Sequence, residues 1–134
     1  MTTEIVYKGS LRCEATHVIS NTLIETDAPL DNKGKGAKFS PSDLLAVALG
    51  TCIITTIGIK TAAWEKPLEG TRLEVTKIMA SEPRRVGALN IDIYLPEGLQ
   101  LDDKEQKILE NIVRTCPVAQ SLHPDLQQNV TFRG

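Results

Sequence analysis

The feature that most constrains the fold is a run of 16 residues without a charged side chain, from Leu44 to Ile59. A helix of that length spans about 24 Å at about 1.5 Å per residue, which is short of the roughly 30 Å hydrocarbon core of a bilayer. The run also contains three threonines and two glycines. We therefore expect a helix that is buried in a protein core rather than a membrane span.

The residues before this run form a helix start. Ser40 or Ser42 can cap the helix, and Pro41 suits its first turn. Asp43 places negative charge at the positive end of the helix dipole. The helix is expected to run to about Ala63.

Apolar side chains cover nearly the whole circumference of this helix, and a helix of that kind must be covered on all sides. A sheet of the same chain can cover one side, and the only other cover is a single shorter amphipathic helix. A second copy of the chain would supply the missing surface, so we predict a homodimer. The apolar positions are Leu44, Leu45, Val47, Leu49, Ile53, Ile54, Ile57 and Ile59.

The N-terminal third of the chain has the alternation of strands. β-Branched and polar residues alternate in residues 4–18 and 23–26, around the turn formers Gly9 and Asn21. This pattern predicts an antiparallel meander. Residues 27–40 combine a proline, two glycines and three lysines, which is typical of a surface loop.

The C-terminal half predicts a hairpin, an amphipathic helix and a closing strand. Residues 72–80 and 88–95 form the expected hairpin. Asp102 and Glu105 make a capping box for the helix, which ends at Cys116 because the next residue is a proline. The pattern "PVAQSL" predicts a short helix and "NVTFRG" a strand, so the fold class is α+β, with an antiparallel sheet packed around the long apolar helix.

Size and charge narrow the possible functions. A chain of 134 residues is expected to form one domain, residues 1–134. Its net charge of -2 does not indicate binding to nucleic acid or to a membrane surface, so a small-molecule partner is favoured. The N-terminus lacks the pattern of a secretion signal, and we expect the cytoplasm. His17 and His123 have no recognisable metal-binding spacing to the cysteines, so we expect no metal and no cofactor.

The three cysteines are Cys13, Cys52 and Cys116, an odd number without a CxxC pair, which still allows a transient redox disulfide. A thiol reacts as the thiolate, which needs a cation, a helix N-terminus or a hydrogen bond. Cys116 precedes a short helix whose N–H groups would stabilise a thiolate, whereas Cys52 lies about ten residues into its helix, beyond the range of the dipole. From the residues alone, a cysteine in an apolar helix is most often a small buried hydrophobe. The cations that could activate Cys52 are Arg12, Arg84, Arg85 and Arg114.

Two motifs and their order resemble the OsmC/Ohr family of bacterial thiol-dependent hydroperoxide reductases. They are "SPSDLLAVALGTC" before the long apolar helix and "TCPVAQSL" near the C-terminus, with a hairpin between them. The resemblance covers essentially the whole chain. It implies an intertwined α+β homodimer whose active sites lie at the subunit interface.

The resemblance also implies residue roles. Cys52 matches the peroxidatic cysteine of the family and Cys116 its resolving cysteine. Arg12 is the expected activating cation, with Arg84 or Arg85 as alternatives. By family chemistry the thiolate attacks the peroxide bond, the resulting sulfenic acid condenses with the second thiol, and an external dithiol, of the dihydrolipoyl kind in relatives, reduces the disulfide.

The chain departs from the family pattern at one position. Peroxidases of the family carry a glutamate directly after the proline of the helix start, and this glutamate holds the activating arginine. The chain has Ser42 there, followed by Asp43, and these two residues are the candidates for supporting the arginine. Cys13 has no counterpart in the family's cysteine pair and is expected to be structural.

The leading hypothesis is a thiol-dependent peroxidase that reduces organic hydroperoxides in oxidative stress defence. The alternative is an OsmC-like protein that keeps the dimer but binds a small apolar ligand or senses thiol oxidation. The serine in place of the family glutamate is the feature that supports the alternative.

Overall fold

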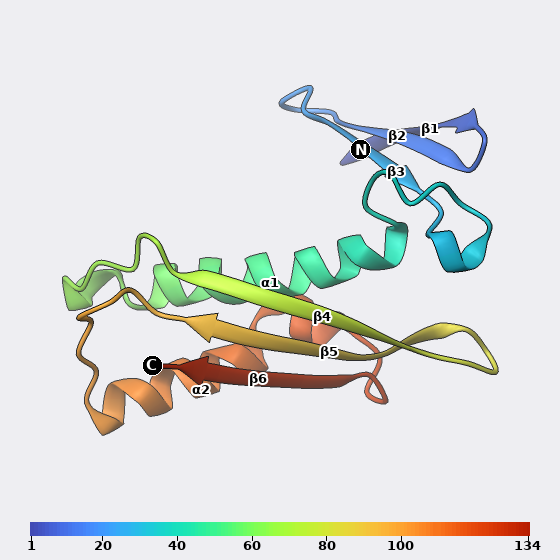
Figure 1. The fold of residues 1–134 in the computed structure, drawn as a ribbon. Helices are drawn as coiled ribbons and strands as arrows, with labels where there is room; N and C mark the ends of the chain where they lie inside the picture. Colours follow the sequence, from blue (N-terminus) through green and yellow to red (C-terminus); the bar gives the residue numbers. More distant parts are fainter. The chain divides into compact units, whose positions relative to one another are not determined.

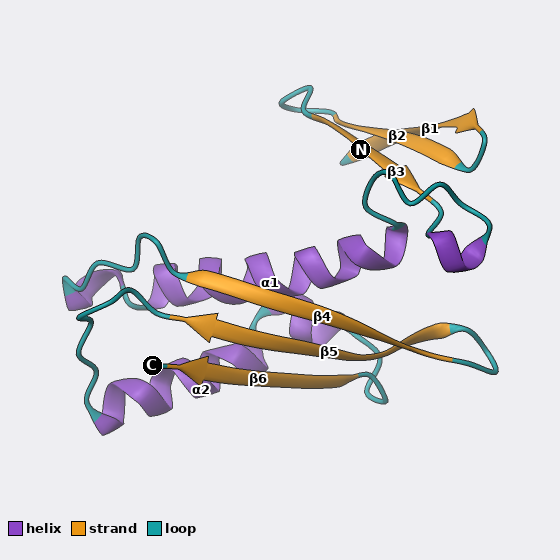
Figure 2. Ribbon diagram, in the orientation of Figure 1, coloured by secondary structure: helices purple, strands orange, loops and turns teal.

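The computed structural model describes residues 1–134 and shows an α+β protein, as expected (Figure 1). Backbone contacts divide it into two compact units, Met1–Leu45 and Ala46–Gly134, and the single domain stays a prediction. Figure 2 distinguishes the helices from the strands. The elements are β1 (Thr3–Gly9), β2 (Arg12–His17), β3 (Leu23–Asp27), the 3₁₀ turn η1 (Leu30–Asn32), α1 (Pro41–Lys60), the 3₁₀ turn η2 (Ala62–Trp64), β4 (Arg72–Ala80), β5 (Arg85–Tyr94), α2 (Asp103–Thr115), α3 (Pro117–Ser121) and β6 (Gln127–Arg133).

The first unit contains the predicted antiparallel meander, a sheet in the order β1-β2-β3. The turn between β2 and β3 includes Asn21 with a positive φ of 60°, a conformation that asparagine tolerates better than most residues. The resulting register places Arg12, the first residue of β2, opposite Asp27, the last residue of β3.

The expected loop follows β3 and folds back on itself. The N–H of Gly34 donates to the carbonyl of Pro29 at 2.9 Å, and that of Gly36 to the carbonyl of Ala28 at 3.2 Å. A Cβ at Gly34 would lie 1.7 Å from the Ala28 carbonyl oxygen, so only glycine fits there. The loop is thus closed by its own backbone.

Helix α1 starts where the sequence indicated, with Ser40 at its cap. The Ser40 hydroxyl accepts from the Asp43 N–H at 3.0 Å, and the Asp43 carboxylate accepts from the Ser40 N–H at 2.9 Å. This reciprocal pair is a capping box with aspartate in the place of glutamate. The helix ends at Lys60, three residues before the predicted Ala63, and the chain continues into the 3₁₀ turn η2.

The second unit is built on a sheet in the order β4-β5-β6. β4 and β5 form the predicted hairpin, although β5 begins at Arg85, three residues before the predicted start. β6 pairs with β5 in parallel, so the sheet is mixed rather than purely antiparallel. The reason is the connection through α2 and α3, which carries the chain back along the sheet, as a parallel crossover requires.

One face of this sheet packs against α1 and α2 (Figure 1). A Cβ added at Gly50 would lie 3.2 Å from the Val75 side chain, so this glycine lets α1 approach β4 closely. The fully buried residues of the core are mostly aliphatic side chains of α1, α2 and β5. They include Leu49, Ile53, Ile57, Leu89, Ile91, Ile93 and Leu109.

Helix α1 is long and apolar enough to cross a membrane. This is weak evidence for a membrane span, because the core helices of soluble proteins can be equally long and apolar. Only 28% of its most apolar stretch is buried within the chain. Its apolar circumference is therefore largely uncovered in a single copy, as the sequence argument expected.

Helix α2 has the predicted capping box. The Asp102 carboxylate accepts from the Glu105 N–H at 2.7 Å, and the Glu105 carboxylate accepts from the Asp102 N–H at 3.0 Å. The helix ends before Cys116, whose extended backbone (φ -65°, ψ 149°) is the conformation that a following proline favours. Cys116 thereby becomes both the last cap of α2 and the first cap of α3.

Candidate active site

The second unit brings Cys52 and Cys116 together. Cys52 lies on α1 and is half-buried, whereas Cys116, between α2 and α3, has no exposed surface. Both belong to one apolar cluster, and their side chains are hydrogen-bonded to each other. Neither forms a disulfide, so the structure shows two reduced thiols in contact.

The Cys116 thiol has a raised pKa. Burial is the largest cause, and the hydrogen bond to Cys52 and the negative charge of its thiolate raise the pKa further. The N–H groups of Ala119 and Val118 act in the opposite direction but do not outweigh burial. The N–H groups at the start of α3 therefore stabilise the thiolate as predicted, but desolvation of the side chain outweighs them, and the pKa is raised.

This environment distinguishes the two sulfurs. Cys116 is held as a neutral thiol, and a second negative charge beside Cys52 is disfavoured. Cys52 keeps access to solvent, and its sulfur lies 4.0 Å from the Thr56 hydroxyl, one helical turn further along α1. Cys52 is thus the sulfur that a reagent from solvent can reach.

Arg12 is held by two carboxylates of the first unit. Its Nε donates to Asp27 Oδ1 at 2.7 Å and its Nη2 to Asp27 Oδ2 at 2.8 Å, a bidentate pair. Its Nη1 lies 3.7 Å from the Glu25 carboxylate. A third of the arginine side chain remains exposed, so the guanidinium is oriented but still reachable.

Asp27 is the partner of Arg12 that the sequence analysis missed. Its side chain is only 3% exposed, and besides Arg12 it accepts a hydrogen bond from the backbone of Ala37. The hydrogen bonds and charge of Arg12 are the main reason that the pKa of Asp27 lies below its usual value. The signal was present in the sequence, because the meander register puts the strand-ending aspartate directly opposite Arg12.

Ser42 and Asp43 lie at the start of α1. The Asp43 carboxylate closes the capping box with Ser40, and the Ser42 hydroxyl lies 3.2 Å from that of Ser40. The carboxylate that forms the ion pair with Arg12 is that of Asp27. The chain thus carries an arginine–carboxylate pair although serine stands at the family's glutamate position.

The remaining candidates have local roles. Arg85 donates to the carbonyls of Ser81 and Pro83 and so holds the hairpin turn. Arg84 lies exposed in the same turn. Cys13 lines a hollow on one face of the sheet of the first unit.

The two histidines are exposed and bind their own turns. His17 Nδ1 lies 2.6 Å from the Ser20 hydroxyl, and His123 Nδ1 accepts from the Asp125 N–H at 3.0 Å. No group of three or more histidine, cysteine or acidic side chains is arranged to hold a metal ion.

The mixed sheet, the capped apolar helix and the paired thiols define a class of small α+β dithiol proteins. The chain belongs to the OsmC-like protein family, whose model matches residues 34–131. That range includes both cysteines of the second unit.

Solved structures share the fold. A protein of Psychrobacter arcticus 273-4, described as an osmotic stress induced and detoxification response protein, is 50% identical, with a TM-score of 0.94 over 99% of this chain and 96% of that one. The organic hydroperoxide resistance protein OsmC of Legionella pneumophila is 14% identical, with a TM-score of 0.75 over 100% and 98%. OhrB of Bacillus subtilis, an organic hydroperoxide resistance protein, is 13% identical, with a TM-score of 0.70 over 99% and 98%. Among curated protein sequences, none matches the chain.

Proposed function

We propose that the protein is a thiol-dependent peroxidase that reduces organic hydroperoxides. Family membership and neighbours named for organic hydroperoxide resistance suggest a peroxide-related role. The observation that carries the finer proposal is the contact between an accessible thiol, Cys52, and a buried neutral thiol, Cys116. A pair of this kind is suited to a cycle of oxidation and disulfide formation.

The proposed cycle has three steps. The Cys52 thiolate attacks the terminal OH oxygen of the hydroperoxide and the O–O bond breaks, so that Cys52 becomes a sulfenic acid. The other oxygen leaves as an alkoxide that takes a proton to give the alcohol. The Cys116 sulfur then attacks the sulfenic sulfur, forming a disulfide and releasing water. An external dithiol, of the lipoyl type, reduces the disulfide by exchange and becomes a disulfide itself.

Arg12 is proposed to activate Cys52, with Asp27 holding the guanidinium in place. A cation near a thiol favours the thiolate and stabilises the negative charge that develops on the leaving oxygen. The bidentate pair fixes the arginine through Nε and Nη2, and leaves Nη1 with only a loose contact to Glu25. In this scheme Asp27 is a positioning residue, and the capping box of Ser40 and Asp43 starts the helix that carries Cys52.

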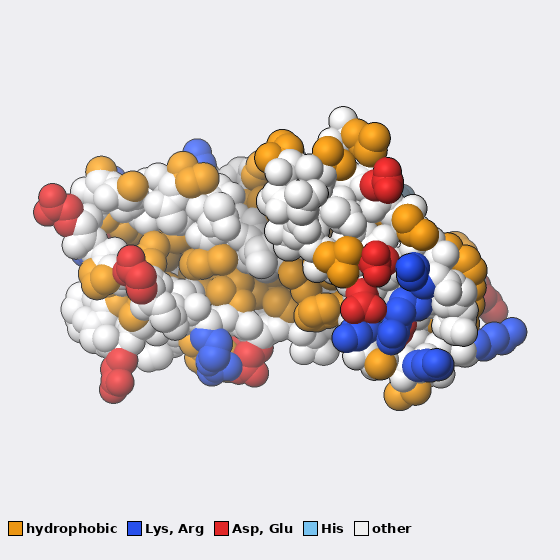
Figure 3. Space-filling model, turned by 90° about the horizontal axis from the view of Figure 1, so that it is seen from above, with side chains coloured by type: hydrophobic (Ala, Val, Ile, Leu, Met, Phe, Trp, Pro, Cys, Tyr) orange, Lys and Arg blue, Asp and Glu red, His pale blue; other side chains and the backbone are white.

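We also propose that the active protein is a homodimer. The outer stripe of α1 carries four exposed, uncharged side chains spaced by four residues, Val47, Thr51, Thr55 and Ile59, and Ile59 is 71% exposed. Apolar side chains reach the surface in several places on the face that Figure 3 shows, where charged side chains also lie. An exposed apolar surface of this kind is typical of an association site.

The first unit adds a second uncovered surface. One face of its three-stranded sheet forms an apolar hollow of about 500 Å³, in which Ile5 and Ile24 are 63% and 47% exposed. So small a sheet needs a packed face to be stable, and a second copy of the chain would supply it.

Light scattering in solution tests the dimer. The wild-type protein is expected to have twice the chain mass of 14.7 kDa, and Ile59→Asp is expected to dissociate it. The matched control is Ile78→Asp on β4, which makes the same substitution at another exposed isoleucine outside the proposed interface and is expected to leave the mass unchanged. A monomeric wild type at micromolar concentration would contradict the proposal.

The peroxidase proposal is tested by supplying an alkyl hydroperoxide and a lipoyl-type dithiol to four proteins. Wild type and Cys13→Ser are expected to consume the peroxide at equal rates, and Cys52→Ser to show only the background rate. Cys116→Ser is expected to complete one turnover and to accumulate a sulfenic acid that dimedone traps. A wild type that consumes no more peroxide than Cys52→Ser would refute the enzyme.

One result would favour the alternative function. If the wild type formed the disulfide between Cys52 and Cys116 but turned over no peroxide in the presence of the dithiol, the pair would act as a sensor of thiol oxidation. A cytoplasmic location fits both functions, because reducing conditions there regenerate the thiols.

A further inference from the structure

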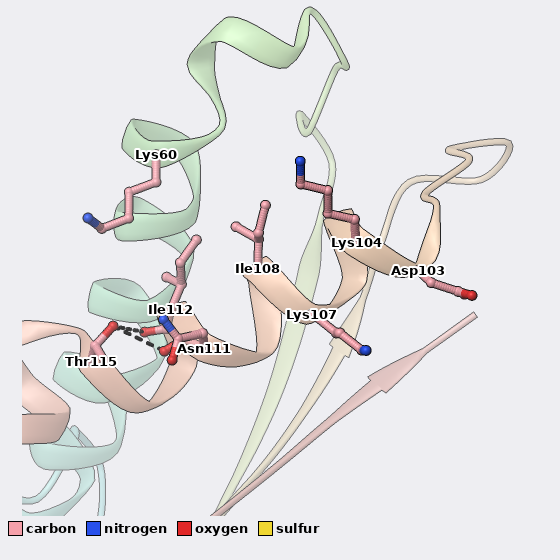
Figure 4. Close-up of a pocket in the computed structure, with 8 residues that line it drawn as sticks. All are labelled: Lys60, Asp103, Lys104, Lys107, Ile108, Asn111, Ile112 and Thr115. Atoms are coloured by element: carbon pink, nitrogen blue, oxygen red, sulfur yellow. Dashed lines mark hydrogen bonds between the residues drawn. The ribbon is translucent and has the colours of Figure 1, made fainter.

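The second unit contains a hollow of about 520 Å³ between the last turn of α1 and one side of α2 (Figure 4). We call it the lysine groove. None of the cysteines lines it. The lining residues are Lys60, Asp103, Lys104, Lys107, Ile108, Asn111, Ile112 and Thr115.

Two rows of side chains, each spaced by four residues, form the α2 side of the groove. One row passes from an exposed lysine through a half-buried isoleucine to a buried one, and the other consists of polar groups. The rows are Lys104, Ile108 and Ile112, and Lys107, Asn111 and Thr115. Across the groove from them, Lys60 projects from α1 (Figure 4). The groove therefore has an apolar floor and a cationic rim.

The charges on the rim are not neutralised by the protein. The side chains of Lys60, Lys104 and Lys107 make no hydrogen bond or ion pair, and neither does that of Asp103, the one carboxylate in the lining. A lysine just outside the groove behaves differently: Lys66 forms an ion pair of 2.7 Å with Glu105 at the start of α2.

Helix stability does not explain one of these lysines. Lys104 lies in the first turn of α2, where positive charge opposes the helix dipole. Lys107 lies three residues after Lys104 but four residues after Asp103, and opposite charges at that spacing attract each other. Lys104 is therefore slightly unfavourable for the helix on which it lies.

We propose that the lysine groove binds an organic anion with an apolar chain, a medium-chain carboxylate. The lysines match the carboxylate head, the free amide of Asn111 can donate to it, and Ile108 and Ile112 match the chain. The volume is in the range of small-molecule sites. The net charge of -2 argues against a large polyanion in the same place. This proposal does not depend on the peroxidase function.

Calorimetry with three ligands tests the chemistry. Decanoate, at concentrations below its micellar range, is expected to bind with a saturable isotherm. Decanol, which has the chain without the charge, and acetate, which has the charge without the chain, are each expected to bind at least about tenfold more weakly. Added salt is expected to weaken decanoate binding, because exposed charges are screened. Equal binding of decanoate and decanol, or no saturable binding of decanoate, would overturn the proposal.

A pair of variants tests the location. Lys60→Gln with Lys104→Gln is expected to lower the affinity for decanoate by about 2- to 30-fold, the combined effect of two exposed ion pairs. The control, Lys8→Gln with Lys33→Gln, makes the same change of charge on exposed residues outside the groove and is expected to leave the affinity unchanged. Amide NMR spectra verify that both variants are folded, and the decanoate-dependent shifts are expected to fall in residues 103–115. An equal loss in the control would mean that the effect is one of overall charge, and would reject the groove as the site.

Discussion

The arginine cluster of the first unit and the thiol pair of the second are built on opposite principles. Arg12 is surrounded by carboxylates and is oriented by charge-assisted hydrogen bonds at 2.7 and 2.8 Å. Cys52 and Cys116 are surrounded by aliphatic side chains, where burial keeps the second sulfur neutral. In the proposed mechanism, the activating charge and the thiols are thus held by different forces.

The difference teaches which forces protect each half of the proposed site. Packing of the apolar core holds the thiol pair, so its geometry depends on side-chain volume. Hydrogen bonds and charge hold the arginine, so its geometry depends on pH and on one buried carboxylate. Each half can therefore be broken by a change that leaves the other half folded.

The largest effect on stability is expected from Ile53→Ala, next to Cys52. Ile53 is fully buried, and its truncation should lower the free energy of unfolding by about 2–5 kcal/mol. Urea unfolding followed by circular dichroism measures this loss. The control on the same helix is Ile59→Ala, which the single chain leaves 71% exposed. Its effect should be within about 0.5 kcal/mol at dilutions where the dimer dissociates. Equal losses at such dilution would mean that packing does not separate the two faces of α1.

The next effect is on catalysis, and it depends on the proposed function. Arg12→Gln is expected to reduce the rate of peroxide reduction about 100-fold, because a preorganised cation is removed from the thiol. The double variant Arg12→Gln/Asp27→Asn removes the carboxylate left unpaired and should show the same loss in a folded protein. Stopped-flow measurement of Cys52 oxidation gives the rates. Arg85→Gln, in the hairpin turn, should keep the wild-type rate, and an equal loss there would transfer the role of activator to the hairpin.

Local rules in the sequence predict much of the scaffold. Alternation in residues 4–18 and 23–26 predicts the meander, and the capping box at Asp102 and the proline after Cys116 set both ends of α2. The features that were missed depend on distant residues. The parallel pairing of β6 is a consequence of the crossover, and the length of β5 is set by its partner β4.

The candidate site shows the same limit. Sequence motifs identify Cys52 and Cys116 as a pair, but they carry no information on the burial that outweighs the N–H groups of α3 and raises the pKa of Cys116. Asp27 lies outside both motifs, whereas the position of Ser42 lies inside one of them. Its role follows from strand register, a relation between residues 15 positions apart.

A smaller effect is expected from pH on the arginine cluster. The pKa of Asp27 is lowered in the folded chain, so its pairing contributes stability that is fully present above about pH 4, its unfolded value, and is lost as pH falls through the folded pKa. Asp27→Asn lacks this contribution at every pH. The difference in urea midpoint between wild type and Asp27→Asn should therefore be constant near neutrality and shrink in acid. The control Glu74→Gln removes the carboxylate of an exposed pair with Arg72 and should change the urea midpoint less. A midpoint difference for Asp27→Asn that does not depend on pH would contradict the contribution of the ion pair.

The smallest expected effect concerns the Cys116 thiol itself. Cys52→Ala in a Cys13→Ser background leaves Cys116 as the single cysteine and removes the hydrogen bond and charge that raise its pKa. The pKa should fall but stay above the usual value, because burial is the largest cause and remains. Titration of the thiolate absorbance, with Cys13→Ser/Thr56→Ala as a folded comparison, measures the shift. A fall to the usual value would show that Cys52, and not the aliphatic surroundings, keeps Cys116 neutral. Electrostatic interactions would then control the thiol pair as well as the arginine cluster.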